Sequence, residues 1–417
     1  MPDLATGSYT LENAHITSSA KKIYTGSLSV HNKRICYYHH GGPHINLGDD
    51  FIVYPALINS HDHLRGNYLP RVGPSPGSFY LNWLPWDNDL KASDVYAERS
   101  NLSIETMYML GSFKNLFSGV TTVQDHFPHA QNRNILPELP IRAFLGYGLA
   151  HESSSYDLKW GDGIELEHKR AVQNDWPFIT HLAEGFDEES MNGVQTLMDM
   201  GILDDYCVLV HCIALSSVDI DLLAQAKSHV VWCPASNMFM FNVTCKVRQL
   251  LKAGVNLSLG TDSTHTGSFN LFEEMHTARA VYRSLYGEDL PAKTLFDMVT
   301  LNPAKAFHIE DRLGSLDSGH FADILILKAK TDDVFENIVH ASAEDIEFLS
   351  MKGKALYGTL RFIDVLGGSL PDGYSIINVG GTPHFIIGDP VTMYRAIRTT
   401  VGYNKILDFL PFEPEEQ

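Results

Sequence analysis

The sequence has few cysteines and no arrangement of them that would hold a metal ion or build a disulfide framework. Its 417 residues include five cysteines, and no two of them form a CxxC pair. Because the number is odd and the spacing irregular, the simplest interpretation is reduced, buried thiols. We therefore expect a cytoplasmic protein.

The chain also lacks long apolar runs and an excess of basic residues. No run of 18 or more apolar residues occurs, so no transmembrane helix is expected. Residues 1–20 have no basic flank followed by an apolar core, so no signal peptide is expected either. The 31 basic residues against 50 acidic ones give a formal net charge of −19. Such a surface repels phosphate backbones and anionic lipids, so we expect neither a nucleic acid nor a membrane as partner.

Apolar residues are plentiful, and in the middle of the chain they form a repeating pattern. Hydrophobic residues make up 44% of the sequence, which is enough for a large core. Short apolar runs alternate with helical segments, and this alternation predicts parallel strands joined by right-handed crossovers. The length suits a barrel of roughly 250 residues plus a smaller domain. The fold class is therefore α/β, a (β/α)8-type TIM barrel. The strands are predicted at 51–60, 119–126, 141–150, 177–184, 206–215, 229–237 and 255–263.

Short strands without helical periodicity occur near both ends of the chain, at 8–55 and 310–365. They predict one small β-sandwich domain formed by both termini. The predicted division of the chain is 1–55 for the first part of that domain, 56–309 for the catalytic barrel, 310–365 for its second part and 366–417 for a C-terminal extension.

Histidines and carboxylates stand where the predicted barrel strands end, and in parallel barrels these ends share one face. Two histidines at i and i+2 on a strand point to the same side and can chelate one metal ion. A third imidazole and a carboxylate complete the nitrogen and oxygen ligand set that zinc or iron accepts. Each feature alone has an ordinary explanation, such as a chance histidine pair or a helix N-cap, but together they predict a catalytic metal site. The residues are His61, His63, His181, Glu184, His211 and Asp262.

The segments around these residues resemble a known family. PALINSHDHL, THLAE, VHC and LGTDS are similar, in that order, to the motifs of the amidohydrolase superfamily. The resemblance is to its deaminase and chlorohydrolase branch, which includes cytosine, guanine and S-adenosylhomocysteine deaminases and triazine hydrolases. It continues through WCPASN, SFNLFEEMHTAR and LNPAKAFHIEDRLGSLDSGHFADILIL, and so covers about residues 8–360.

The resemblance implies a role for each of the matched residues. It implies one divalent metal ion per chain, zinc or iron, and a homo-oligomer. Other branches hold two metals through a carboxylated lysine, but IRAFLGYGLA at 141–150 contains no lysine, which favours one metal. Glu184 would be the acid/base and His211 would orient water or substrate. The implied metal ligands are His61, His63, His181 and Asp262.

The leading hypothesis is hydrolytic deamination of an amino-substituted nitrogen heterocycle of the purine, pyrimidine or triazine type. The metal would lower the pKa of bound water towards neutrality. Asp262 and His211 would take or orient the proton of that water, and Glu184 would protonate a ring nitrogen and then the departing amine.

Three other interpretations were compared with this one. The same site could dechlorinate a ring or open a cyclic amide. The protein could also be a catalytically inactive metal-binding scaffold. The small zinc deaminase class is disfavoured because its HxE and PCxxC signature is absent.

One irregularity in the predicted barrel supports the scaffold interpretation. Only about 26 residues separate the predicted strands 141–150 and 177–184, so no separate fourth strand is visible. We expect strand 4 to be missing, or to be a degenerate segment such as 151–160.

Substrate contacts are harder to predict, because each candidate also has an ordinary explanation as a loop or core residue. The sequence contains no recognisable arginine clamp for an anionic substrate, and Arg65 is the nearest candidate for one. The residues expected to contact substrate are Trp86, His126, His151, Asn237 and His265.

Overall fold

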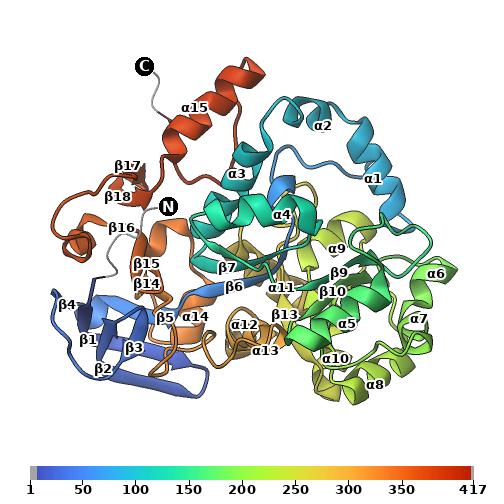
Figure 1. Cartoon of the computed structure of the whole chain (residues 1–417), viewed down its shortest axis with the longest axis horizontal. Coiled ribbons are helices and arrows are strands. Elements are labelled where there is room, and N and C mark those ends of the chain that lie inside the picture. Colours follow the sequence, from blue (N-terminus) through green and yellow to red (C-terminus); the bar gives the residue numbers. More distant parts are fainter. Residues whose placement is uncertain (1–6, 415–417) are drawn as a thin grey trace.

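A computed structural model describes residues 7–414, which form an α/β body beside a sheet built from both ends of the chain (Figure 1). The α/β body holds eight parallel strands within these residues. They are β6 (Leu57–Asp62), β7 (Val120–Asp125), β8 (Arg142–Ala143), β9 (Gly148–Glu152), β10 (Phe178–Leu182), β11 (Cys207–His211), β12 (His229–Trp232) and β13 (Asn256–Leu259).

The eight strands form two hydrogen-bonded sheets, ordered β6-β7-β8 and β13-β12-β11-β10-β9. The sheets meet where β13 ends beside β6, and there the Asp262 amide donates to the His61 carbonyl over 3.1 Å. A Cβ on Gly260 would lie 2.6 Å from the His61 Cβ, so this close approach requires glycine. The meeting of the two sheets places His61 and Asp262 next to each other.

The prediction of a missing or degenerate fourth strand was wrong. The segment 141–150, predicted as one strand, contains the end of one strand and the start of the next: β8 pairs with β7, and β9 pairs with β10. Only residues 144–147 join them, and a Cβ on Gly146 would lie 2.7 Å from the Trp176 side chain. The crossover helix is absent rather than the strand. No ladder connects β8 to β9 in the described residues, and 151–160 supplies only the end of β9 followed by a loop.

Helices connect most of these strands and cover the body. Several begin at a side chain that caps free backbone amides, such as Asn82, Ser93, Ser103 and Asn270. The helices are α1 (Trp83–Ala92), α2 (Asp94–Arg99), α3 (Ile104–Leu116), α4 (His129–Ile135), α5 (Ile164–Asn174), α6 (Glu188–Met191), α7 (Gly193–Asp199), α8 (Ser217–Ala226), α9 (Pro234–Phe241), α10 (Val247–Ala253), α11 (Leu271–Tyr286), α12 (Ala292–Met298), α13 (Leu301–Ala306), α14 (Val334–Val339) and α15 (Pro390–Val401). Short 3-10 turns occupy Gly48–Asp50, Leu64–Gly66, Leu136–Glu138, Ala343–Asp345 and Leu360–Leu366.

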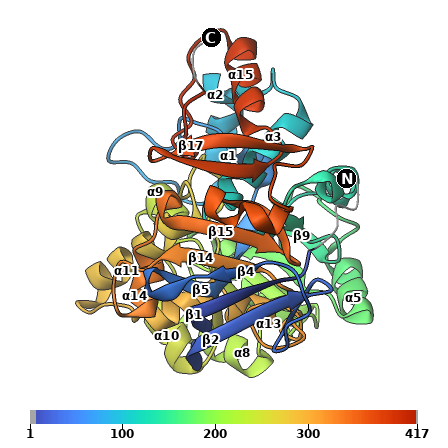
Figure 2. The same cartoon turned by 90° about the vertical axis from the view of Figure 1, so that its left-hand side faces the viewer.

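Strands from both ends of the chain form one further sheet, which faces the viewer in Figure 2. Its order is β17-β18-β16-β15-β14-β5-β1-β2-β3, and β4 pairs with β1. A sheet made from strands of both termini is consistent with the predicted small β-sandwich domain, although it also includes two strands from the predicted C-terminal extension. Its strands are β1 (Tyr9–Ser19), β2 (Lys22–His31), β3 (Arg34–Cys36), β4 (His44–Asn46), β5 (Phe51–Pro55), β14 (Ile324–Lys328), β15 (Ile346–Met351), β16 (Lys354–Thr359), β17 (Tyr374–Val379) and β18 (Thr382–Ile387).

The central strand β14 of this sheet is apolar on both faces, and successive residues belong to different cores. Ile324 and Ile326 pack into a cluster made only of residues from the two ends of the chain. Leu325 and Leu327 point the other way, into the large core shared with the α/β body. Because side chains alternate between the two faces of a strand, one face of β14 packs against other residues of the terminal segments and the other face packs against the α/β body.

The segment 51–60, predicted as one strand, is two strands in different sheets. β5 belongs to the terminal sheet and β6 to the α/β body, and the chain passes between them at Ala56, whose amide donates to the Asp323 carbonyl over 3.0 Å. A continuous apolar run could not reveal this change of sheet, because both strands are buried.

The C-terminal extension completes the terminal sheet and then packs against the α/β body. Strands β17 and β18 add to its edge through β16, and α15 lies near α3. Beyond α15, the Lys405 ammonium lies 2.7 Å from the Glu98 carboxylate at the end of α2.

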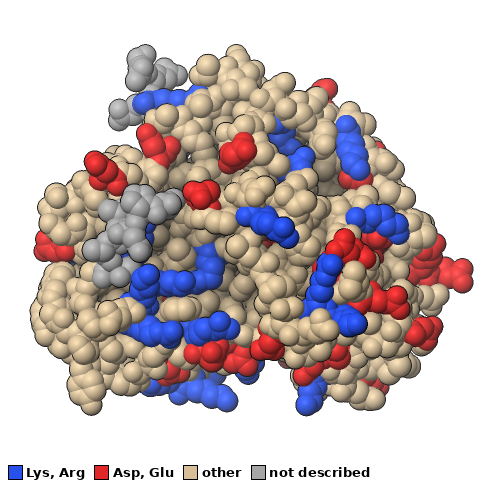
Figure 3. Space-filling model, viewed as in Figure 1, with Lys and Arg blue, Asp and Glu red and all other residues tan. Residues whose placement is uncertain are grey.

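Charged side chains of both signs are interspersed over the right of the face shown in Figure 3, and a small group of basic side chains lies at lower left. The excess negative charge therefore does not form a single acidic field on this face. In residues 7–414 we find no helix that is both long and apolar enough to cross a membrane.

Candidate metal centre

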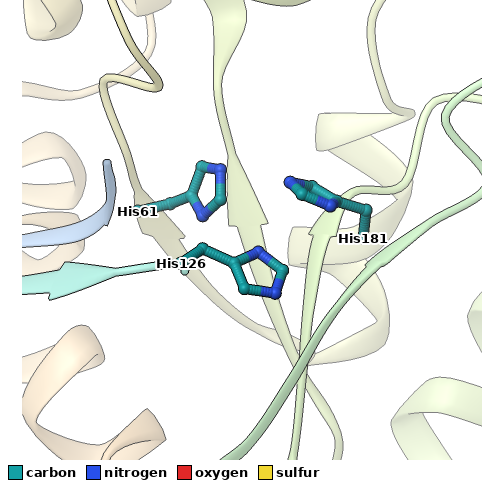
Figure 4. Close-up of side chains that lie close together, drawn as sticks. All are labelled: His61, His126 and His181. Atoms are coloured by element: carbon teal, nitrogen blue, oxygen red, sulfur yellow. The ribbon is translucent and has the colours of Figure 1, made fainter. Parts of the chain in front are cut away.

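Three buried histidines from different strands meet at one end of the parallel strands. His61, His126 and His181 come from the ends of β6, β7 and β10, and their rings surround a common space (Figure 4). One nitrogen from each lies within 4.8 Å of the others. Neither ring nitrogen of His61, nor Nδ1 of His126, has a hydrogen-bond partner among the described residues. Buried polar atoms without partners are costly, and a metal ion would satisfy them.

A second group shares His61 and adds a carboxylate. His61, His63 and Asp262 also offer ligand atoms within 4.8 Å of one another. The Asp262 Oδ1 lies 3.8 Å from His61 Nε2 and 3.5 Å from His63 Nε2. Two ligands at about 2.1 Å from one tetrahedral ion are separated by roughly 3.4 Å. The donor atoms therefore fit a common divalent ion.

Outer hydrogen bonds fix the orientation of two of these rings. The Nδ1–H of His63 donates to the His126 carbonyl over 2.9 Å, and the Nδ1–H of His181 donates to the His151 carbonyl over 2.8 Å. In each ring the other nitrogen, Nε2, then carries no proton, and its lone pair is free to bind a metal ion. Such carbonyl partners are typical of histidines that bind a metal.

Burial also keeps the histidines in the neutral form that can act as a ligand. It lowers the pKa of His61, His126 and His181 well below the usual value, and the neighbouring imidazoles lower it further. Neutral imidazole is the form that coordinates a metal ion.

Asp262 is held as a carboxylate by its surroundings. Burial alone would raise its pKa, but His63, His211 and nearby hydrogen bonds outweigh that effect and keep the pKa below the usual value. Its Oδ2 accepts from the Ser236 and Thr266 hydroxyls over 2.7 and 2.9 Å. Its backbone has a φ of +54°, which turns the chain out of strand geometry just after β13. Such strained positions cluster at functional sites.

Glu184 and His211 face each other at the edge of the same cluster. Strand alternation would point Glu184 away from His181, but Ala183 adopts a φ of +52° and turns the chain back. The Glu184 Oε1 lies 3.5 Å from His211 Nε2. Burial raises the Glu184 pKa well above its usual value, and the negative charge of Asp262 adds to this. The carboxyl group is therefore suited to carry a proton.

A buried ion pair supports the strands that carry these residues. The Lys114 Nζ on α3 donates to Asp62 Oδ2 over 3.1 Å, to Thr261 Oγ1 over 2.9 Å and to the Asp262 carbonyl over 3.1 Å. Lys114 and Asp62 are fully buried. The lysine thus joins the end of β6 to the segment that carries Asp262.

The cluster opens into a cavity of about 280 Å³. Its wall includes several large aromatic side chains, among them Trp83 and Trp86 on α1, Phe127 after β7, and Trp160 in the loop after β9. His151 lies between two of them, with its ring centroid 4.4 Å from that of Trp83 and 4.7 Å from that of Trp160. Helices α1 and α2 supply one side of this cavity.

The structure brings some of the predicted site residues to the cavity and places others behind it. Of the expected substrate contacts, Trp86, His151 and His265 line the cavity. His126 is fully buried in the histidine cluster. Asn237 lies behind His211, and its Oδ1 accepts a hydrogen bond from the His211 Nδ1–H over 2.8 Å. The predicted residues that line the wall near the cluster are His63, His181, Glu184, His211 and Asp262.

Sequence reasoning missed several cavity residues, among them large side chains on α1, on α2 and in a loop. Trp83 and Trp160 were not singled out, and neither was Arg99 at the end of α2. None of these three positions directly follows the end of a strand, so the rule that located the other residues could not find them. Trp83 belongs to the same aromatic segment as Trp86, which was the one available signal.

Comparisons with known proteins agree with this geometry. Residues 171–358 match the model of the Amidohydrolase family. A 5-methylthioadenosine/S-adenosylhomocysteine deaminase of Moorella thermoacetica is 30% identical over 369 residues, covering 76% of this chain and 84% of the relative. The protein of that name from Thermoanaerobacter pseudethanolicus is 26% identical and covers 74% of this chain and 82% of the relative. The chain therefore belongs to the amidohydrolase family.

The fold agrees with that assignment. A crystal structure of an adenosine deaminase from Xanthomonas campestris with bound zinc superposes with a TM-score of 0.72 at 18% identity, covering 94% of this chain and 97% of that one. Within the family, this protein is a deaminase-like amidohydrolase with a buried histidine cluster that could hold a metal.

Proposed function

We propose that this protein is a metal-dependent hydrolase that releases ammonia from an amino-substituted nitrogen heterocycle. The observation that carries the proposal is the meeting of a metal-ligand set with a proton-carrying carboxyl group at an aromatic cavity. The ligands would be His61, His63, His181 and Asp262, with Glu184 beside them.

The ligand set fits zinc or iron, since it offers neutral imidazoles and one carboxylate. A bound divalent ion supplies an activated water at neutral pH and polarises the substrate. The zinc-bound adenosine deaminase with the same fold supports this choice. His63, His181 and Asp262 line the cavity, so an ion held there could be reached by substrate.

The remaining groups of the site would move protons. Asp262 Oδ1 faces the ligand nitrogens and would accept a proton from the attacking water. Glu184, whose pKa is raised by burial, would give a proton to a ring nitrogen, regain one from the newly added hydroxyl as the carbonyl forms, and pass it to the departing amine. The proton that Asp262 takes from water would then restore the protonated Glu184. His211 is oriented by Asn237, so its Nε2 can hold the water or the substrate in place.

The cavity wall favours a flat, apolar ring as the substrate. Trp83, Trp86, Phe127 and Trp160 line the cavity, and aromatic rings pack well against such side chains. The relatives named as deaminases of adenine nucleosides support an amino-substituted ring. The purine, pyrimidine and triazine types are all compatible with this wall.

The proposal is tested by ammonia release from a panel of aminopurines, aminopyrimidines and aminotriazines, measured on protein with known metal content. We expect release from at least one class by protein carrying about one zinc or iron per chain. Chloride release from chlorinated rings, or opening of cyclic amides without ammonia, would instead support the other hydrolytic activities. A metal-loaded protein without turnover on any of these compounds would support the scaffold interpretation.

The Glu184→Gln variant tests the proton-transfer role. It keeps the shape of the side chain but removes the proton carrier, so we expect kcat to fall by about 10²- to 10⁴-fold. Metal content should not change, because Glu184 is not one of the proposed ligands. Glu188→Gln on α6, an exposed position, is the matched control. Unchanged kcat in Glu184→Gln would contradict the assigned role.

A further inference from the structure

The cavity has a positively charged side formed by two arginines. Arg65, just after β6, and Arg99, at the end of α2, both line the cavity. Arg99 is only 9% exposed. Burial lowers its pKa, and the nearby charge of Arg65 lowers it further. Two like charges next to each other at a buried wall are unfavourable unless something compensates them.

The compensation that the described residues supply is weak. The Arg99 guanidinium lies over the Tyr96 ring, 4.8 Å from its centroid, and makes no contact with a carboxylate there. Across residues 7–414, neither Arg65 nor Arg99 forms an ion pair with a carboxylate. Arg99 donates to His265 Nε2 over 2.7 Å, and Arg65 donates to Gln131 Oε1 over 3.0 Å. Both partners are neutral. Arg65 also lies over the Phe127 ring, 5.2 Å from its centroid.

Two acidic residues that could have paired with the arginines are each engaged by a lysine. Glu98 precedes Arg99, but its Oε1 accepts from Lys405 over 2.7 Å and from Tyr68 over 2.6 Å. Asp87, at the cavity, pairs with Lys91 over 2.5 Å. The ion pairs therefore neutralise Lys91 and leave the two arginines available for a ligand.

We propose that the substrate carries a carboxylate, which Arg65 and Arg99 bind at the side of the cavity formed by α2 and the turn after β6. This inference rests on the proposed function, because it assigns the substrate class of the same site. The heterocycle would lie against the tryptophans with its amino group toward the metal ligands. The carboxylate would satisfy the buried guanidinium of Arg99.

Guanidinium groups suit this role because their parallel N–H donors match the two oxygens of a carboxylate. A small anion is favoured over a bulky one, because the cavity of about 280 Å³ must also hold the ring and lies just below the usual range of about 300–1,000 Å³ for ligand sites. Because the chain carries a formal net charge of −19, attraction of an anion to the cavity would depend on this local pair of arginines.

Arg99 also has a structural explanation. Its contact with His265 joins α2 to the segment after β13, and the arginine could serve only to hold the two together. That role would affect neutral and anionic ligands equally. A comparison of matched ligands therefore separates the two roles.

The test uses the full chain with its metal and two matched probes, 6-aminonicotinate and 6-aminonicotinamide, with binding measured by calorimetry. The probes have the same ring and nearly the same shape, but only the first carries a charge. We expect the carboxylate to bind at least roughly tenfold more tightly than the amide. The preference should weaken as salt is added.

Variants assign the preference to the two arginines. In Arg99→Met and in Arg65→Met the carboxylate should lose most of its roughly tenfold advantage, while the amide binds as before. Arg71→Met is the matched control, because Arg71 donates to the Gly267 carbonyl over 2.7 Å and lies outside the cavity wall. Circular dichroism and metal content establish that each variant is folded and loaded.

Equal binding of the two probes by the wild type, or failure of both to bind, would overturn the proposal. A preference that persists without both arginines would also overturn it, and tighter binding of the matching phosphonate would overturn the choice of carboxylate. The proposed function is judged separately by ammonia release. Deamination of neutral rings alone would support the proposed function and contradict the proposed carboxylate binding. Binding of the carboxylate without any turnover would support carboxylate binding and contradict the proposed function.

Discussion

At the scale of single residues, the histidines of the cluster differ in what surrounds their nitrogen atoms. His63 and His181 point Nε2 into the cluster because Nδ1 is bound to a carbonyl, and both reach the cavity wall. His126 instead donates from Nε2 to the Ala150 carbonyl over 2.9 Å and lies behind the wall. An ion held by His126 would be further from substrate than one held by His63 and Asp262, and a catalytic metal needs an open position.

The metal content of two variants tests this distinction. We expect Asp262→Ala to lose the bound zinc or iron, because it removes the carboxylate ligand. His126→Asn should retain about one ion per chain, because the proposed set does not include it. Asp221→Ala on α8, at an exposed position, is the control for general effects of losing a carboxylate. Loss of metal in His126→Asn together with its retention in Asp262→Ala would contradict this assignment. His126 would then be a metal ligand and Asp262 would not.

At the scale of elements, the site depends on how β6 and β13 are held together. No strand ladder joins β6 to β13. The two strands are connected instead by the backbone hydrogen bond from Asp262 to His61 and by the buried Lys114 side chain. A charge this deeply buried is stable only with its partner. The helix α3, which carries Lys114, is therefore part of the support for the metal ligands.

Replacing Lys114 by methionine should leave the Asp62 carboxylate buried without its cation. We expect a loss of about 3–5 kcal/mol in the free energy of unfolding, measured as a shift of the denaturant midpoint. Lys169→Met on α5, where the side chain is exposed, should have little effect. An unchanged midpoint in Lys114→Met would contradict a supporting role for the ion pair.

At the scale of the whole molecule, the C-terminal extension connects the terminal sheet to the helices beside the cavity. It adds two strands to that sheet and then reaches α2, where Lys405 and Tyr403 bind Glu98. Partial burial raises the Glu98 pKa, but these hydrogen bonds and that of Tyr68 outweigh it and hold the pKa below the usual value. The extension thereby fixes the helix that carries Arg99.

We expect Lys405→Met to destabilise the protein by about 1–3 kcal/mol at neutral pH. The pKa of Glu98 is lowered in the folded state, so its stabilisation is complete above the unfolded value of about 4.3 and is lost as pH falls below it. The difference in melting temperature between wild type and Lys405→Met should therefore shrink below about pH 4. Lys252→Met, on α10 and exposed, is the control. A difference that does not change with pH would exclude Glu98 as the cause.

Sequence alone determined the class of the fold and the residues at the strand ends. Apolar strands alternating with helices require a parallel arrangement, and such an arrangement brings the ends of distant strands to one face. His61, His181, His211 and Asp262 could therefore be placed together, although they are far apart in the chain. The motifs around them also identified the family.

Only the tertiary structure decided the features that depend on contacts between segments with no shared pattern. A continuous apolar run could not show that 51–60 contains two strands, because burial on both faces removes the alternation that marks a strand boundary. The boundary within 141–150 was hidden for another reason, since β8 is only two residues long and half-buried. Arg99 and Trp160 reach the cavity from a helix end and a loop, where no periodicity applies. Local sequence determines periodicity and strand ends, but the surroundings of a charge such as Arg99 depend on every segment that packs around it.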